Sequence, residues 1–233
     1  MTIENWLHKL SEYSNLQLIL LFLTENFLII VLAVFFGKYI ELENTKVRKS
    51  DIKWIVSTLT CNTIITMIGF KLYCFNILKF NFNESIYQII IDILLLVFII
   101  DFIMFWSHFL AHKLNFFYSI HKHHHNHVST SVYSLFILHP IETIGFGVIL
   151  ISIITIFHFN FYSITAYLIL NISYGVLGHL KTDLFPKFWN NFLVTKFITN
   201  TKFHNKHHID ESANFGFYFT IWDMFIKTYN KQK

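Results

Sequence analysis

The chain has few of the residues on which several enzyme classes depend. Its 233 residues include two cysteines, two prolines, seven glycines and a single arginine, Arg48. Cys61 and Cys74 lie in a hydrophobic stretch without C-x-x-C spacing, which predicts buried free thiols and argues against iron–sulfur and zinc–thiolate sites. There is no glycine-rich dinucleotide fingerprint and no H-P-G-G haem segment. A formal charge of +4 without a basic stripe argues against a nucleic-acid partner.

Charged residues are also scarce, at 14%, while 54% of the residues are hydrophobic and 19% aromatic. This balance is typical of a membrane protein. A helix needs about 20 apolar residues to cross a bilayer core. We therefore predict an all-α integral membrane protein with four to five transmembrane helices, the last two forming a tight hairpin. The predicted spans are Leu16–Ile40, Ile52–Leu78, Tyr87–Trp106, Ile141–Phe157 and Phe161–Leu177.

Positive charge gathers in two parts of the chain. Four basic residues lie between the first two spans, and eight lysines follow Leu177. Because loops rich in Lys and Arg stay in the cytoplasm, we expect the 41–53 loop, the 108–127 segment and the C-terminus on that side. Residues 79–85 and 158–160 should lie on the opposite side. We expect a bacterial inner membrane, or the endoplasmic reticulum if the source is eukaryotic.

Histidines form three clusters with helical spacing. In "HKHHHNH" (121–127), a rotation of about 100° per residue places three rings on one face and turns His123 and His127 away. "HNKHH" repeats this H-x-x-H-H spacing, and "HFLAH" places two histidines four residues apart. His179 follows the last span. The nine candidate ligands are His108, His112, His121, His124, His125, His179, His204, His207 and His208.

Nine imidazoles are about twice the four ligands of a structural zinc ion, so the clusters predict two metals. Imidazole binds iron, zinc, copper and nickel, which leaves the metal open. One alternative is a disordered metal-scavenging tract. Another is a membrane metal transporter, which should carry its histidines along the spans rather than at one end of them.

Several segments resemble the fatty acid hydroxylase/sterol desaturase superfamily of membrane-bound, histidine-rich di-iron oxygenases. "DFIMFWSHFLAH" is similar to its D-x-x-x-[YF]-W-x-H-x-x-x-H segment, "SIHKHHHNH" to I-H-K-x-H-H, and "HPIE" to H-P-x-E. "HNKHH" and "NFGFYFTIWDMF" are similar to its H-x-x-H-H and N-[YF]-G-x(5)-W-D-x-x-F ending. The resemblance extends over residues 98–228. Phe109 departs from it, since many members have arginine there.

The resemblance implies a membrane anchor with a cytosolic, histidine-rich helical cap. It implies two non-haem iron ions bound by the nine histidines, with O2 as co-substrate. It also implies that the substrate is a membrane lipid, which is either hydroxylated or desaturated. The sequence does not distinguish these two reactions. Electrons should come from a separate donor, such as a cytochrome b5-like protein, a ferredoxin or a reductase. Residues 1–97 then form the anchor, and residues 98–228 the di-iron domain with its transmembrane hairpin at 141–177.

Three further residues are expected to support the site. Asp101 is seven residues before His108, hence on the same helical face, and is expected to orient a ligand histidine. Asp183, four residues after His179, is expected to be a ligand or a hydrogen-bond acceptor for one. His139 precedes Pro140 and is expected to begin a helix or support the site rather than bind metal. Trp222 and Asp223 are expected to pin the tail onto the cap.

Overall fold

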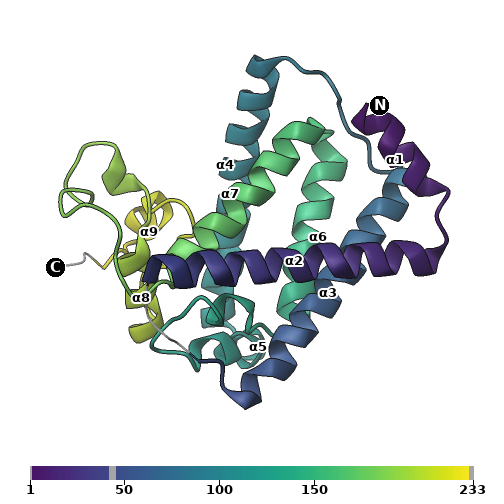
Figure 1. Ribbon diagram of the computed structural model, residues 1–233. Coiled ribbons are helices and arrows are strands. Elements are labelled where there is room, and N and C mark those ends of the chain that lie inside the picture. Colours follow the sequence, from purple (N-terminus) through teal and green to yellow (C-terminus); the bar gives the residue numbers. More distant parts are fainter. Residues whose placement is uncertain (1, 42–45, 231–233) are drawn as a thin grey trace.

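Residues 2–41 and 46–230 are described by a computed structural model, shown in Figure 1. The described chain is helical without a β-strand, which confirms the all-α prediction. The helices are α1 (Ile3–Ser11), α2 (Asn15–Glu41), α3 (Lys49–Cys74), α4 (Ile86–Lys113), α5 (Asn115–His125), α6 (Pro140–Phe157), α7 (Phe161–His179), α8 (Thr201–Ile209) and α9 (Ile221–Ile226), with short 3-10 turns η1 (Ser134–Phe136) and η2 (Thr195–Phe197).

Five of these helices are long and apolar enough to cross a membrane: α2, α3, α4, α6 and α7. Each coincides with a predicted span, so the protein is a multi-pass membrane protein. Large apolar side chains such as Leu32, Phe35 and Leu94 are exposed along them. Such a surface suits lipid rather than water.

Two predicted boundaries differ from the structure. The second span was expected to reach Leu78, but α3 ends at Cys74 because Asn76 adopts a left-handed conformation with φ 56°. The amides of Ile77 and Leu78 then both donate to the Leu72 carbonyl, which caps the helix. The third span continues beyond Trp106 as one helix to Lys113. This extension carries the first histidine pair out of the apolar part of α4.

The turn between α6 and α7 is held in place by a hydrogen bond to α4. His158 has a left-handed conformation and ends α6. The side chain of Asn160 caps α7 by accepting from the Tyr162 amide at 2.8 Å. Asp92 of α4 accepts a hydrogen bond from the Asn160 amide, also at 2.8 Å. The hairpin is thereby tied to α4, against which α7 also packs along its length.

The short helices α5, α8 and α9 lie together at one end of the long helices, and α1 lies toward the other end (Figure 1). At the first end, Arg48 lies 2.6 Å from the ring of His127, and the Glu41 carboxylate accepts from the Lys181 amide. The loop between α2 and α3, the end of α5 and the segment after α7 are therefore neighbours. This agrees with their predicted placement on one side of the membrane.

Candidate metal centre

All nine predicted ligands lie at this end of the molecule, in two adjoining groups. Within each group the ring nitrogens that face one another lie within 4.8 Å. Six of the nine side chains are buried and the other three half-buried. The five-histidine group is His108, His112, His121, His125 and His207, and the four-histidine group is His124, His179, His204 and His208.

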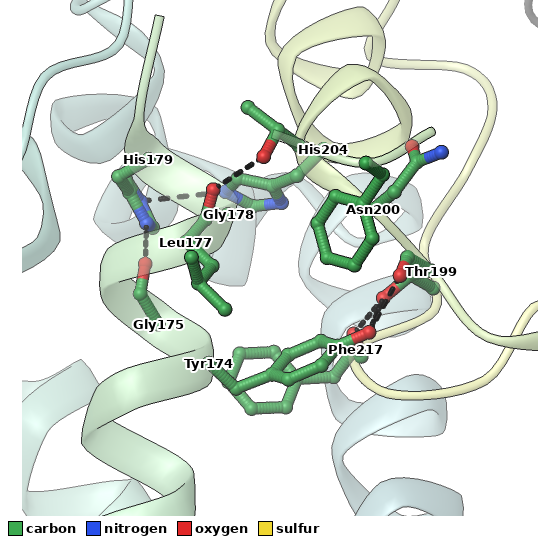
Figure 2. A pocket seen from close by; sticks show the side chains of 11 residues that line it. Tyr174, Gly175, Leu177, Gly178, His179, Thr199, Asn200, His204 and Phe217 are labelled. Atoms are coloured by element: carbon green, nitrogen blue, oxygen red, sulfur yellow. Dashed lines mark hydrogen bonds between the residues drawn. The ribbon is translucent and has the colours of Figure 1, made fainter. Parts of the chain in front are cut away.

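The four-histidine group is built from three helices. His124 comes from α5, His179 is the last residue of α7, and α8 supplies His204 and His208. The Nε2 atom of His179 lies 3.3 Å from that of His204 (Figure 2). It lies 3.3 Å from Nε2 of His124 as well, and the Nε2 atoms of His204 and His208 are 3.1 Å apart. Around a tetrahedral metal with bonds of about 2.1 Å, neighbouring ligand nitrogens are roughly 3.4 Å apart. The spacing is therefore compatible with an ion between these nitrogens.

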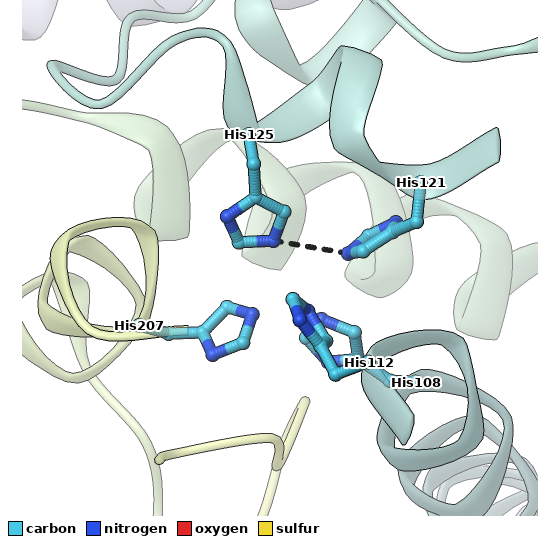
Figure 3. Close-up of side chains that lie close together, drawn as sticks. All are labelled: His108, His112, His121, His125 and His207. Atoms are coloured by element: carbon cyan, nitrogen blue, oxygen red, sulfur yellow. Dashed lines mark hydrogen bonds between the residues drawn. The ribbon is translucent and has the colours of Figure 1, made fainter. Parts of the chain in front are cut away.

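The five-histidine group also joins three helices. His108 and His112 are one turn apart on α4, His121 and His125 one turn apart on α5, and His207 comes from α8. The five rings point toward a common centre (Figure 3), and the Nε2 atoms of His121 and His125 are 3.0 Å apart. Three separate segments of the chain are thus needed to complete this group.

Each H-x-x-H-H motif contributes to both groups. On α5 the i, i+4 pair His121 and His125 enters the five-histidine group while His124 enters the other, and on α8 the division is reversed. The groups consequently adjoin: the rings of His125 and His208 are stacked with centroids 4.6 Å apart. Two ions held by these groups would be close neighbours.

Backbone carbonyls fix several rings through the nitrogen that faces away from the group. The Nδ1 atom of His108 lies 2.9 Å from the Phe215 carbonyl, that of His207 2.7 Å from the Ala213 carbonyl, and that of His179 2.8 Å from the Gly175 carbonyl. An Nδ1–H that donates to a carbonyl leaves the lone pair on Nε2, which faces into the group. The tautomer needed for metal binding is therefore set by the fold.

Two glutamates support the five-histidine group, and neither was among the predicted site residues. Glu142 Oε1 lies 2.6 Å from His121 Nδ1, and Glu211 has oxygens 3.7 Å from His112 Nδ1 and 3.8 Å from His125 Nδ1. The "HPIE" motif was a usable signal for Glu142, which lies in the first turn of α6, a helix in contact with α5. Glu211 follows α8 in a turn, where helical spacing gives no signal.

The donor set fits a transition metal ion. His112 Nε2 and His207 Nε2 are buried and have no hydrogen-bond partner among the described residues, although an imidazole nitrogen needs one. Burial, and then neighbouring histidines, lower the pKa of the rings outside the spans well below the ordinary value of 6.5, which keeps them neutral: His124, His125, His204, His207 and His208. Neutral imidazoles that present lone pairs suit iron, zinc, copper or nickel rather than magnesium or calcium.

The other histidines of this region lie outside both groups. His123 packs against Trp54, with ring centroids 4.6 Å apart, and His127 lies 3.5 Å from Asp51. His123 thus lies on the side of α5 that the helical rotation assigns to it, whereas His127 lies beyond the end of α5 at His125. His139 begins α6, where its Nδ1 accepts from the Ile141 amide at 3.3 Å.

The expected role of Asp101 is wrong. Its carboxylate is fully buried and accepts hydrogen bonds from the Tyr218 amide at 2.6 Å, the Phe219 amide at 3.3 Å and Trp222 Nε1 at 2.6 Å. Seven residues correspond to about 10 Å along a helix, so Asp101 shares a face with His108 but lies too far below it to reach a ring. It fixes the C-terminal segment instead.

The Asp223 carboxylate holds that segment from the other side. It accepts from the Phe215 amide at 2.9 Å and the Gly216 amide at 2.7 Å, as expected for a residue that pins the tail. Because the Phe215 carbonyl positions His108, the two aspartates act on the site through the backbone.

Asp183 is also outside both groups, and none of its contacts within the described part of the chain is with a histidine, so neither expected role, ligand or acceptor for a ligand, agrees with its position. One oxygen accepts from the Phe185 amide at 3.2 Å and the other lies 3.4 Å from Lys202 Nζ. The spacing of four after His179 has no helical meaning here, because α7 ends at His179.

A small cavity of about 20 Å³ lies beside the four-histidine group. Its walls include the rings of Tyr174 and Phe217 together with His179 and His204 (Figure 2). Phe185 also lines it. Tyr174 donates its hydroxyl to the Thr199 carbonyl at 2.6 Å, which leaves the wall largely apolar.

The chain is similar to several known proteins. The chain is 32% identical over 137 residues to Protein CER1-like 2 of Arabidopsis thaliana, covering 55% of this chain and 22% of that protein. It is 25% identical over 194 residues to lathosterol oxidase of Homo sapiens, covering 80% of this chain and 62% of that protein. The chain thus spans less than two thirds of either relative, and no solved structure matches it. The fatty acid hydroxylase family model matches residues 93–228, more than half of the chain, and the protein belongs to this family.

Proposed function

We propose that the protein is an O2-dependent membrane lipid hydroxylase that binds two non-haem iron ions. The observation that carries this proposal is the convergence of nine histidines into two adjoining groups at one end of five membrane spans. Membership of the fatty acid hydroxylase family supports iron over the other metals that imidazole binds.

The ligands of the two ions are the two groups themselves. The five-histidine group would hold one ion and the four-histidine group the other, and the bound pair would supply the chemistry that reduces O2 and oxidises an unactivated C–H bond. The chain's own part is to orient the rings through the Phe215, Ala213 and Gly175 carbonyls and through Glu142. Burial of the rings keeps water away from them, and residues 98–228 would form the catalytic domain on an anchor of residues 1–97.

The substrate is proposed to be a membrane lipid. Two observations support this: the histidine groups lie at one end of the five spans, and the cavity beside His179 and His204 has aromatic walls. The matched family is named for fatty acids and the human relative for a sterol, so both lipid classes belong in the test. Electrons would come from a separate cytochrome b5-like protein, ferredoxin or reductase, with the histidine end facing the cytoplasm.

Two other functions are distinguishable. Desaturation would use the same site and the same O2, and differs only in its product. Metal transport would need ligands along a path through the membrane, whereas both histidine groups lie at one end of the described spans. This arrangement favours an enzyme.

The test is a comparison of lipids from cells that express the wild-type protein, the His204→Ala variant or the His123→Ala variant. The proposal predicts a lipid heavier by one oxygen with the wild-type protein and with His123→Ala, which alters a ring outside both groups. His204→Ala should lack it. Loss of two hydrogens would identify a desaturase, and altered cellular metal content with unchanged lipids would favour transport.

A further inference from the structure

The segment 184–197, which connects α7 to α8, exposes an unusual number of large apolar side chains. Apart from the turn η2 it contains no helix. Five of its apolar side chains are exposed by 46% to 72%: Leu184, Phe188, Phe192, Leu193 and Val194. A concentration of exposed apolar side chains within 14 consecutive residues is typical of an interaction site.

The exposure is a property of an ordered loop. The Trp189 amide donates to the Pro186 carbonyl at 2.8 Å, and the Phe192 amide to the Phe188 carbonyl at 3.0 Å. The Thr195 hydroxyl donates to the Trp189 carbonyl at 2.7 Å, which closes the loop on itself. Because the backbone is held from within, the apolar side chains are directed outward by the fold.

The segment is continuous with the lipid-facing surface of the spans. The Thr220 amide donates to the Phe197 carbonyl at 2.9 Å, which joins the segment to the start of α9. On α9, Trp222 packs against Phe98 and Phe102 of α4, with ring centroids 5.6 and 5.1 Å apart. Figure 1 shows the segment as the green loop that projects sideways next to α9.

The charged residues of the segment are those expected of a protein segment that lies at a membrane surface. Lys187 is exposed, and Lys196 lies over the Phe197 ring at 4.8 Å. Asp183, the acid directly before the segment in the sequence, is paired with Lys202. Apolar side chains mixed with lysines and a half-buried tryptophan are typical of segments that lie at the boundary between lipid headgroups and acyl chains.

We propose that the segment 184–197 is embedded in the bilayer leaflet on the side of the histidine groups. Leu193 and Val194 would reach the acyl boundary, while Lys187 would meet anionic headgroups. The consequence for the site rests on the proposed function. Phe185, next to the embedded residues, lines the cavity at His179 and His204, so a lipid could reach the four-histidine group without crossing water.

The test measures the depth of spin labels in bilayer nanodiscs of phosphatidylcholine and phosphatidylglycerol. Labels are attached to Leu193→Cys and, separately, Phe188→Cys in a Cys61→Ser/Cys74→Ser background. Ile169→Cys, exposed on α7, provides the lipid reference, and Ser129→Cys, exposed after α5, the water reference. The readout is the ratio of collisions with O2, which dissolves in lipid, to collisions with a water-soluble nickel chelate.

We expect the ratio at Leu193 and Phe188 to exceed that at Ser129 several-fold and to approach that at Ile169. Equal ratios at Leu193, Phe188 and Ser129 would overturn the proposal. Leu193 alone decides if the Phe188 variant does not fold. The measurement needs no metal, substrate or turnover, so its outcome is separate from that of the proposed function.

Discussion

Replacing Glu142 by glutamine tests how far the second layer of the site controls metal binding. Glu142 Oε1 lies 2.6 Å from His121 Nδ1, and both side chains are less than 10% exposed. Glutamine has nearly the same shape but no charge. His121 therefore loses the charge-assisted hydrogen bond that fixes its tautomer and makes Nε2 a stronger donor to a metal.

Removing such a partner lowers metal affinity or activity about 10- to 100-fold, or roughly 1.4 to 2.7 kcal/mol. Since Glu142 contacts a member of the five-histidine group, we expect the ion bound by that group to be lost first. The assay is dialysis of iron-loaded protein against increasing chelator, followed by elemental analysis. The chelator concentration that removes the first ion should fall by about 10- to 100-fold.

Glu84→Gln is the matched control. This residue lies at the other end of the spans, where its carboxylate accepts from the Tyr162 hydroxyl at 3.4 Å, and its substitution should leave metal retention unchanged. If Glu142→Gln retained both ions as firmly as Glu84→Gln, the inference that Glu142 supports a ligand would be refuted.

Three further predictions concern the histidines and their environment. His124→Ala should abolish product formation and His123→Ala should retain most of it, since only His124 faces the groups; equal loss in product assays, normalised to membrane-inserted protein, would mean that the ligand set is different. Burial lowers the pKa of rings such as His124 and His207 below 6.5, so the unfolded chain takes up protons first as the pH falls. The metal-free protein should therefore have its full free energy of unfolding above about pH 7. Below that pH it should lose up to about 1.4 kcal/mol of this free energy per pH unit for each such ring. A thermal unfolding midpoint that stays constant down to about pH 5 would contradict this. Cysteine-labelling of intact membrane vesicles tests the topology. Lys49→Cys in the 41–53 loop and Lys122→Cys in the 108–127 segment should react from the cytoplasmic side, and Asn83→Cys from the opposite side. Labelling of Lys49→Cys and Lys122→Cys from opposite sides would exclude a single site.

The membrane fold could be predicted because lipid demands long apolar helices, and each apolar run became one. The ends of the helices could not be predicted as well. The end of α3 depends on the left-handed conformation of Asn76, and the run of α4 to Lys113 depends on its packing against α5. The hydropathy pattern indicates neither of these features.

The ligand face of each histidine cluster also followed from sequence, because helical rotation alone separates His124 from His123. The division of each motif between two groups did not, since it depends on how α5 and α8 meet. Inferring a neighbour of the site from helical spacing failed where the spacing extended beyond the end of a helix or over two helical turns. Asp183 follows the end of α7, and Asp101 is two turns below His108.

The central claim is that the nine histidines form two metal sites, and metal content tests it most directly. The protein should be purified after anaerobic iron loading, with helicity measured on the same sample, and its iron counted per chain by elemental analysis. The two histidine groups predict about two ions per chain, and about one after His204→Ala, which removes a ligand of the four-histidine group alone. A folded wild-type protein that binds at most one ion per chain would contradict the account.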